Sequence, residues 1–113
     1  MIEVYHNPRC RKSREACALL DSKGVSYDIR EYLNDSPDQS EIKGLLQKLN
    51  IPAEQLIRKT EAVFKEEYKG KSLTEDEWIE AMVKHPKLIE RPIVIKGDQA
   101  VVGRPPENIQ KLF

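Results

Sequence analysis

A single cysteine, Cys10, stands in the strongly basic segment VYHNPRCRKSR near the N-terminus. Arg9, Arg11 and Lys12 surround it, and Arg14 follows. Positive charge close to a thiol favours the thiolate, which is the nucleophilic form of cysteine. These residue types therefore predict an activated thiol at Cys10, in surroundings that also suit an anion.

The flanking elements place this thiol. Residues 2–5 (IEVY) alternate and are rich in β-formers, which predicts a short strand, whereas residues 11–22 carry apolar side chains at helical spacing. Cys10 then lies just after a strand and at the first turn of a helix, where unpaired N–H groups and the helix dipole stabilise an anion. A lone cysteine is more commonly a small core residue, but the charges on both sides of Cys10 disfavour burial.

Two neighbours could assist the thiol. His6 lies four residues upstream in a predicted loop and could fold back towards the sulfur, although loop histidines are often solvated or cap a turn. Arg14 could contact a bound anion or form an ion pair on the helix surface. The sequence leaves both alternatives open.

The second cysteine, Cys17, follows Cys10 by seven residues. On one helix the two would be separated by about 10 Å along the axis, at ~1.5 Å per residue. A disulfide requires Cα atoms within roughly 7 Å of each other, so we expect no bridge. Cys17 shares an apolar face with Leu20, which predicts a core position.

Three further arginines lie at the ends of predicted elements: Arg58, Arg91 and Arg104. Functional side chains are often held at such places. A guanidinium fork binds a tetrahedral oxyanion through paired N–H groups, which lysine cannot do. Taken singly, each of the three is also typical of a surface arginine.

The composition limits the possible functions. The chain has 113 residues, with 19 basic and 19 acidic side chains, so a net charge of zero argues against broad binding to nucleic acid or anionic lipid. We find no apolar run long enough to span a bilayer and no secretory signal. Two cysteines without a CxxC motif or zinc-ligand spacing predict no metal site, and we expect a cytoplasmic, monomeric protein.

The remaining pattern predicts an α/β fold. The expected elements are a strand over 25–33, a helix opened by residues 35–37, a one-turn segment over 51–60, a helix over 61–69, a helix from the Thr74–Glu77 capping box to Pro86, strands over 91–97 and 99–103 around a tight turn, and a closing helix over 106–113. This is the order of a thioredoxin-like fold with a helical insertion, about residues 34–86, between its β-α-β and β-β-α halves. We expect one domain spanning residues 1–113.

The motif His-x3-Cys-x3-Arg is met by His6, Cys10 and Arg14. With it, the segments YLNDSP, IPAEQLIRK, HPKLIERPIVI and GRPPE make the whole chain resemble the ArsC family of glutathione/glutaredoxin-linked arsenate reductases. The resemblance implies a thioredoxin-like fold in which a proline with a cis peptide bond, here Pro92, begins the strand facing the cysteine.

The resemblance also implies a mechanism. The Cys10 thiolate would attack arsenate or a similar oxyanion, glutathione would attack the adduct as a co-substrate, and glutaredoxin would resolve it as arsenite leaves. No bound cofactor is implied. The family's oxyanion-binding arginines correspond to Arg58, Arg91 and Arg104, its thiol-tuning histidine corresponds to His6, and Arg14 has a supporting place.

One part of the motif departs from the family pattern. Arg11 and Lys12 stand where small residues are usual, and they could favour another anion or a glutathione carboxylate. RKSR resembles the Spx-type regulators that bind RNA polymerase, but Ser13 replaces the second cysteine of their CxxC switch. The alternatives are therefore an Spx-like regulator, or a general glutaredoxin-like thiol oxidoreductase that needs only Cys10.

Overall fold

The computed structural model describes residues 2–113 and divides into two compact units. The sheet unit comprises the chain up to Asp35 together with Arg91–Phe113, and the helical unit comprises Ser36–Glu90. The predicted insertion, about residues 34–86, differs from the helical unit by only a few residues at each end. No helix within residues 2–113 is both long and apolar enough to cross a membrane.

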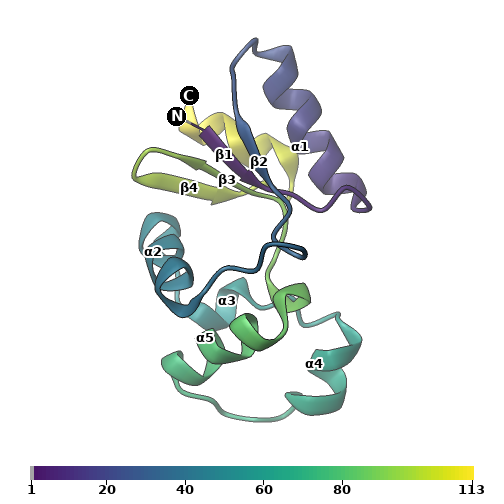
Figure 1. Cartoon of the computed structure of the whole chain (residues 1–113), viewed down its shortest axis with the longest axis vertical. Coiled ribbons are helices and arrows are strands. Elements are labelled where there is room, and N and C mark those ends of the chain that lie inside the picture. The colour runs from purple at the N-terminus through teal and green to yellow at the C-terminus, as the bar shows by residue number, and fades with distance from the viewer. Residues whose placement is uncertain (1) are drawn as a thin grey trace. The chain divides into compact units, whose positions relative to one another are not determined.

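The sheet unit confirms the predicted thioredoxin-like α/β order (Figure 1). Its four strands lie in the order β2-β1-β3-β4, with β1 parallel to β2 and antiparallel to β3, and β4 antiparallel to β3. Its elements are β1 (Ile2–Tyr5), α1 (Arg11–Ser22), β2 (Asp28–Arg30), β3 (Ile93–Lys96), β4 (Gln99–Val102) and the 3-10 helix η2 (Pro106–Leu112).

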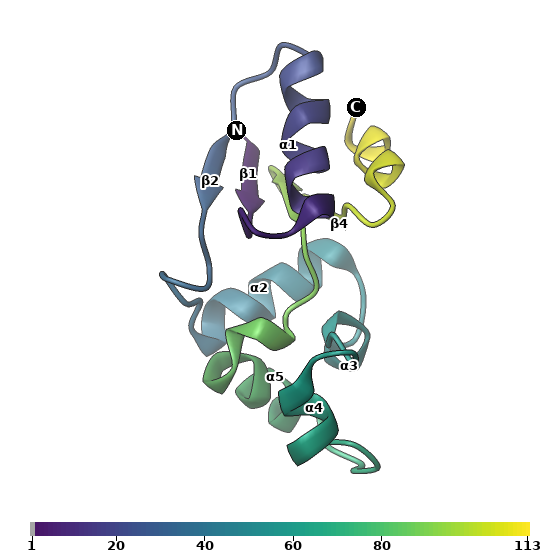
Figure 2. The same ribbon diagram turned by 90° about the vertical axis from the view of Figure 1, so that its right-hand side faces the viewer.

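One face of this sheet holds the core that fixes α1. Alternation along β1 directs Ile2 and Val4 to the same face, where they join Val94 of β3. Helices α1 and η2 lie side by side on this core (Figure 2) and contribute Ala16, Leu20, Ile109 and Leu112. Each large apolar side chain buried in this way stabilises the fold by roughly 1.5–3 kcal/mol.

The sheet unit also differs from the sequence prediction in detail. Strand β2 covers three residues rather than residues 25–33, because its only partner, β1, offers just Glu3–Tyr5 for pairing. The closing helix is 3-10 rather than α, and it follows Pro105 and begins on Pro106, neither of which supplies a backbone N–H. In the hairpin, Lys96 pairs with Gln99, so the turn itself is Gly97 (φ 63°) and Asp98.

The helical unit consists of short helices. They are α2 (Gln39–Leu49), α3 (Ala53–Leu56), α4 (Ala62–Glu67), α5 (Glu75–Lys84) and the 3-10 turn η1 (Pro86–Leu88). Of these, α2 and α5 begin with capping boxes. The predicted capping box of Thr74 with Glu77 is confirmed. Helix α2 begins later than predicted, because Asp38, not a residue of 35–37, accepts the Glu41 N–H and forms the box.

The backbone segments around Pro92 and Gly103 pack closely together at the end of the sheet where Arg91 and Arg104 lie. The Arg91–Pro92 peptide bond is cis, as the resemblance implied, and the Arg104–Pro105 bond is cis as well. The Gly103 N–H donates to the Pro92 carbonyl over 2.8 Å. A Cβ at Gly103 would lie 3.1 Å from Pro92 Cγ and 3.3 Å from Ile109 Cδ1.

We expect Gly103→Ala to lower the free energy of unfolding by about 1–3 kcal/mol, because the added methyl group overpacks this junction. Chemical denaturation would measure the change. Gly44→Ala is the matched control: Gly44 lies inside α2 with nothing within 4 Å of its added Cβ, so alanine should raise stability by about 0.5–1 kcal/mol. Equal effects at both glycines would contradict the proposed close packing.

Candidate active site

Cys10 is the N-cap residue of α1. Its backbone is extended (φ −94°, ψ 121°), its N–H donates to the Asn7 carbonyl over 2.9 Å, and its carbonyl accepts the Arg14 N–H over 3.1 Å. The half-buried sulfur lies at the first turn of the helix, where hydrogen bonding by the backbone N–H groups of Ser13 and Lys12 lowers the thiol pKa. The predicted position at a helix N-terminus is therefore observed.

Two arginines from the C-terminal part of the chain converge on this sulfur. Arg104 Nη2 lies 3.5 Å from Cys10 Sγ, and Arg104 Nε donates to the Arg91 carbonyl over 3.2 Å. The Arg91 guanidinium also donates a hydrogen bond to the thiolate. Residues separated by more than 80 positions in the chain thus form one cationic thiol site.

The net electrostatic effect favours the thiolate. Burial of Cys10 raises its pKa, but the Ser13 N–H, the hydrogen bond and charge of Arg91, and the Lys12 N–H together outweigh burial and lower the pKa below its ordinary value. Arg104 Nη2, at 3.5 Å, lies at an ordinary distance for an N–H group that donates to sulfur, so both guanidiniums are placed to stabilise the thiolate.

His6 is buried and contacts helix α1. Its Nδ1 lies 2.6 Å from Ser13 Oγ and 3.7 Å from Cys17 Sγ. Burial lowers the pKa of His6. The charge of Glu31 raises this pKa and the charge of Arg14 lowers it, but the net shift is downward, so the imidazole is neutral near pH 7. The contact to Ser13 links His6 to the turn that holds Cys10.

The basic residues next to Cys10 are largely occupied elsewhere. Arg11 and Lys12 both pair with Glu15, at 3.1 and 3.7 Å, on the surface of α1. Arg14 Nη1 donates to the Pro8 carbonyl over 2.8 Å and so ties the loop to the helix. The charge at the sulfur therefore comes from Arg91 and Arg104 rather than from Arg11 and Lys12.

Cys17 is a free thiol that packs at the edge of the core rather than inside it. Burial raises its pKa, a hydrogen bond from Tyr27 opposes this, and the charge of Asp21 adds to it. The expected absence of a Cys10–Cys17 bridge agrees with two free cysteines. A half-buried thiol with a raised pKa is a poor nucleophile.

Arg58 belongs to the helical unit. Its Nε lies 3.4 Å from Glu61 Oε1, and its Nη1 lies 3.4 Å from Glu90 Oε1. Its backbone N–H donates to the Leu88 carbonyl, next to the bridge between Ile57 and Ile89. Two carboxylates therefore compensate its charge within this unit.

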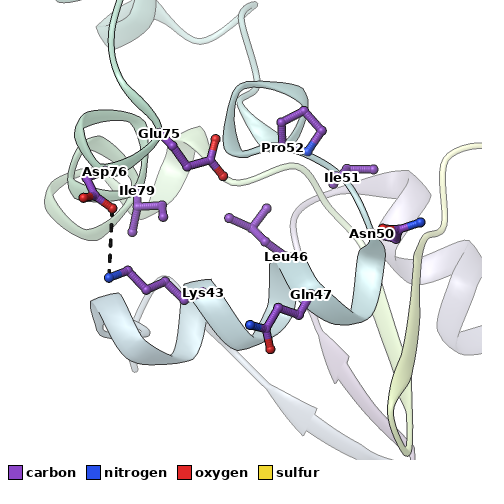
Figure 3. A pocket seen from close by; sticks show the side chains of 9 residues that line it. All are labelled: Lys43, Leu46, Gln47, Asn50, Ile51, Pro52, Glu75, Asp76 and Ile79. Carbon is purple, nitrogen blue, oxygen red and sulfur yellow. Dashed lines mark ion pairs between the residues drawn. The ribbon is translucent and has the colours of Figure 1, made fainter.

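The helical unit also contains a hollow of about 520 Å³ (Figure 3). Its charged side chains include Lys43 and Asp76, which form a 4.0 Å ion pair, and Glu75, whose carboxylate accepts the Ala53 N–H. Neither cysteine nor arginine lines it, so we place no thiol chemistry there. Within residues 2–113, no group of three His, Cys, Asp or Glu side chains could hold a metal ion.

Known proteins are similar to this chain over nearly its full length. The sequence profile of the ArsC family matches residues 5–112. The chain belongs to the ArsC family. The matched residues include Cys10, Arg91 and Arg104.

Relatives within the ArsC family are similar from end to end. A protein of Neisseria meningitidis named arsenate reductase is 40% identical, with 99% of this chain and 97% of that protein covered. YfgD of Escherichia coli K12, which is named as uncharacterized, is 42% identical over 98% of this chain and 95% of its own length. The solved structure of an arsenate reductase from Vibrio cholerae superposes with a TM-score of 0.95 at 43% identity, covering 99% of this chain and 97% of that one.

Two residues of this ArsC-family site escaped the sequence analysis. Ser13 was noted only for replacing a cysteine, although it is fully buried on the face of α1 that also carries Ala16 and Leu20. Its i, i+3, i+7 spacing with those two residues was the available signal. Asn7, whose carbonyl and side chain shape the loop, had only the Asn-Pro turn signature.

We expect the alkylation rate of Cys10 to titrate with an apparent pKa below the ~8.5 of free cysteine. Arg91→Ala should raise this pKa by about one unit, because it removes both a charge and a hydrogen bond. Iodoacetamide labelling against pH, with the modified residue located by mass spectrometry, measures both.

Arg11→Ala is the control for Arg91→Ala, since Arg11 pairs with Glu15 on the helix surface. We expect its labelling profile to match that of the unaltered protein. A larger pKa change for Arg11→Ala than for Arg91→Ala would contradict the assignment of charge at this site.

Proposed function

We propose that this protein reduces arsenate to arsenite at Cys10, with glutathione and glutaredoxin supplying the electrons in the cytoplasm. The observation that carries the proposal is the Cys10 sulfur at the N-terminus of α1, with Arg104 3.5 Å away and Arg91 beside it. Family membership and relatives named arsenate reductase support it.

The chemistry requires one nucleophile and external thiols. The Cys10 thiolate forms a sulfur–arsenic bond, and one arsenate oxygen leaves as water after protonation. Glutathione then forms a second sulfur–arsenic bond, and a second oxygen leaves as water. The glutaredoxin thiolate attacks the glutathione sulfur, and the electron pair of the broken sulfur–arsenic bond passes to arsenic. Water then cleaves the bond between arsenic and Cys10 and restores the thiol. In total, arsenic gains two electrons, two thiols lose one each and leave as a disulfide, and arsenite is released.

External reductants suit this thiol because the chain offers no resolving cysteine within reach. Cys17 is the other cysteine, its pKa is raised, and its sulfur faces His6 rather than Cys10. Ser13 occupies the CxxC position and is buried. A small thiol that diffuses to the half-exposed Cys10 is therefore the simplest electron donor.

Arginine guanidinium groups would bind the oxyanion. Arg91 and Arg104 already lie at the sulfur, where an oxyanion would develop charge during attack. The family resemblance also assigns Arg58 to oxyanion binding, and within the helical unit its guanidinium pairs with Glu61 and Glu90. His6 and Arg14 would act on the thiol indirectly, through Ser13 and the Pro8 carbonyl.

We expect arsenate-dependent oxidation of NADPH when the protein is coupled to glutathione, glutaredoxin and glutathione reductase. Cys10→Ser should abolish it, because serine at neutral pH supplies no comparable nucleophile. Cys17→Ala should retain turnover, since Cys17 is not needed as a resolving thiol. Turnover no greater than that of Cys10→Ser would refute the proposal.

A second candidate, a general glutaredoxin-like thiol oxidoreductase, is favoured by one observation. Arg58, expected in the oxyanion site, is compensated by Glu61 and Glu90, whereas glutathione exchange needs only the Cys10 thiolate. We expect the rate with arsenate to exceed the rate with a glutathione mixed disulfide under the same coupling system. The reverse ranking would assign this second function instead.

A further inference from the structure

We propose that Ser13 is a positioning residue for the nucleophile: its buried hydroxyl joins the His6 ring to the Asn7 backbone and so holds the loop that presents Cys10 to helix α1. The inference deepens the proposed function, because it concerns the same thiol, but it can be tested without arsenate.

The contacts of this hydroxyl are short and fully enclosed. Ser13 has no exposed surface, and His6 and Asn7 are 8% and 9% exposed. Ser13 Oγ lies 2.6 Å from His6 Nδ1 and accepts the Asn7 N–H over 3.0 Å. Water cannot replace either bond at such a site, so removal of the hydroxyl leaves two buried polar groups unpaired.

The hydrogen-bond partners of the Ser13 hydroxyl indicate where its proton lies. The Ser13 oxygen accepts from Asn7, so its single proton is available for His6 Nδ1. Cys17 Sγ also lies near Nδ1, at the longer distance of 3.7 Å. In the arrangement that we propose, Nδ1 accepts the Ser13 proton, and neutral His6 carries its own proton on Nε2.

This arrangement acts on Cys10 through the backbone. Asn7, which donates to the Ser13 hydroxyl, in turn accepts the Cys10 N–H at its carbonyl over 2.9 Å. The backbone N–H of Ser13 is also one of the groups that lower the pKa of the Cys10 thiol. The hydrogen bond between Asn7 and Ser13 thus ties the loop to helix α1. It thereby fixes the position of the Cys10 sulfur at the start of the helix.

Serine is suited to this place in a way that cysteine is not. A thiol is a weaker donor and acceptor than a hydroxyl, and its longer C–S bond would not fit the 2.6 Å contact to His6. The position that forms a redox switch in CxxC proteins therefore has a different task here: it fixes the nucleophile and leaves its reduction to an external thiol.

The test compares Ser13→Ala with Ser22→Ala. Ser22 lies on the same helix, is exposed, and donates to the Leu19 carbonyl, so it is a matched loss of one hydroxyl. Iodoacetamide labelling of Cys10 is followed from pH 5 to 9 by mass spectrometry. We expect Ser13→Ala to raise the apparent thiol pKa by about one unit, which slows labelling about tenfold below the pKa, while Ser22→Ala changes nothing.

Thermal unfolding of both variants separates positioning from general damage. Equal pH profiles for Ser13→Ala and the unaltered protein would overturn the proposal, whatever the change in melting temperature. A raised thiol pKa in a folded Ser13→Ala variant supports it even if arsenate is never turned over, so failure of the proposed function remains distinguishable.

A second measurement does not depend on any variant folding. Nitrogen NMR of the histidine ring in the unaltered protein reports which nitrogen of His6 is protonated. We expect an unprotonated Nδ1 and a protonated Nε2. A proton on Nδ1 would mean that the ring donates to Ser13 Oγ, and it would overturn the assigned arrangement.

Discussion

The site depends on one interaction. The Cys10 sulfur lies at the N-terminus of α1, next to the first N–H groups of the helix. A helix leaves its first N–H groups without partners inside the helix, and those of Ser13 and Lys12 lower the pKa of the Cys10 thiol. Burial alone would raise the thiol pKa, so these donors and Arg91 must outweigh it. The loop, the buried Ser13 and the core contacts of α1 serve to hold this geometry.

The second constraint is the delivery of positive charge to the same point. Arg91 and Arg104 flank strands β3 and β4, which the Gly103–Pro92 hydrogen bond holds together at that end of the hairpin. Arg104 in turn binds the Arg91 carbonyl, so the two guanidiniums are positioned as a pair. Such a pair provides both charge and directed N–H groups for an oxyanion.

Competition between partners decides which cations act on the thiol. Arg11 and Lys12 are adjacent to Cys10 in sequence, but Glu15 lies one helical turn further along and binds both. The charges of Arg11 and Lys12 therefore act on the surface of α1 more than on the Cys10 sulfur. Arg58 shows the same effect, since Glu61 and Glu90 compensate its charge.

The sequence by itself determined the α/β order, the helix N-terminus at Cys10 and the capping box at Thr74, because each follows from local periodicity, turn residues or capping. Only the tertiary structure decided that strand β2 is short, since strand length depends on the partner strand. Only the tertiary structure brought Arg91 and Arg104 to Cys10 and directed His6 to Ser13. These contacts join residues that are far apart in the chain or on opposite sides of a loop. The spacing of residues along the sequence does not predict which of these side chains will be in contact.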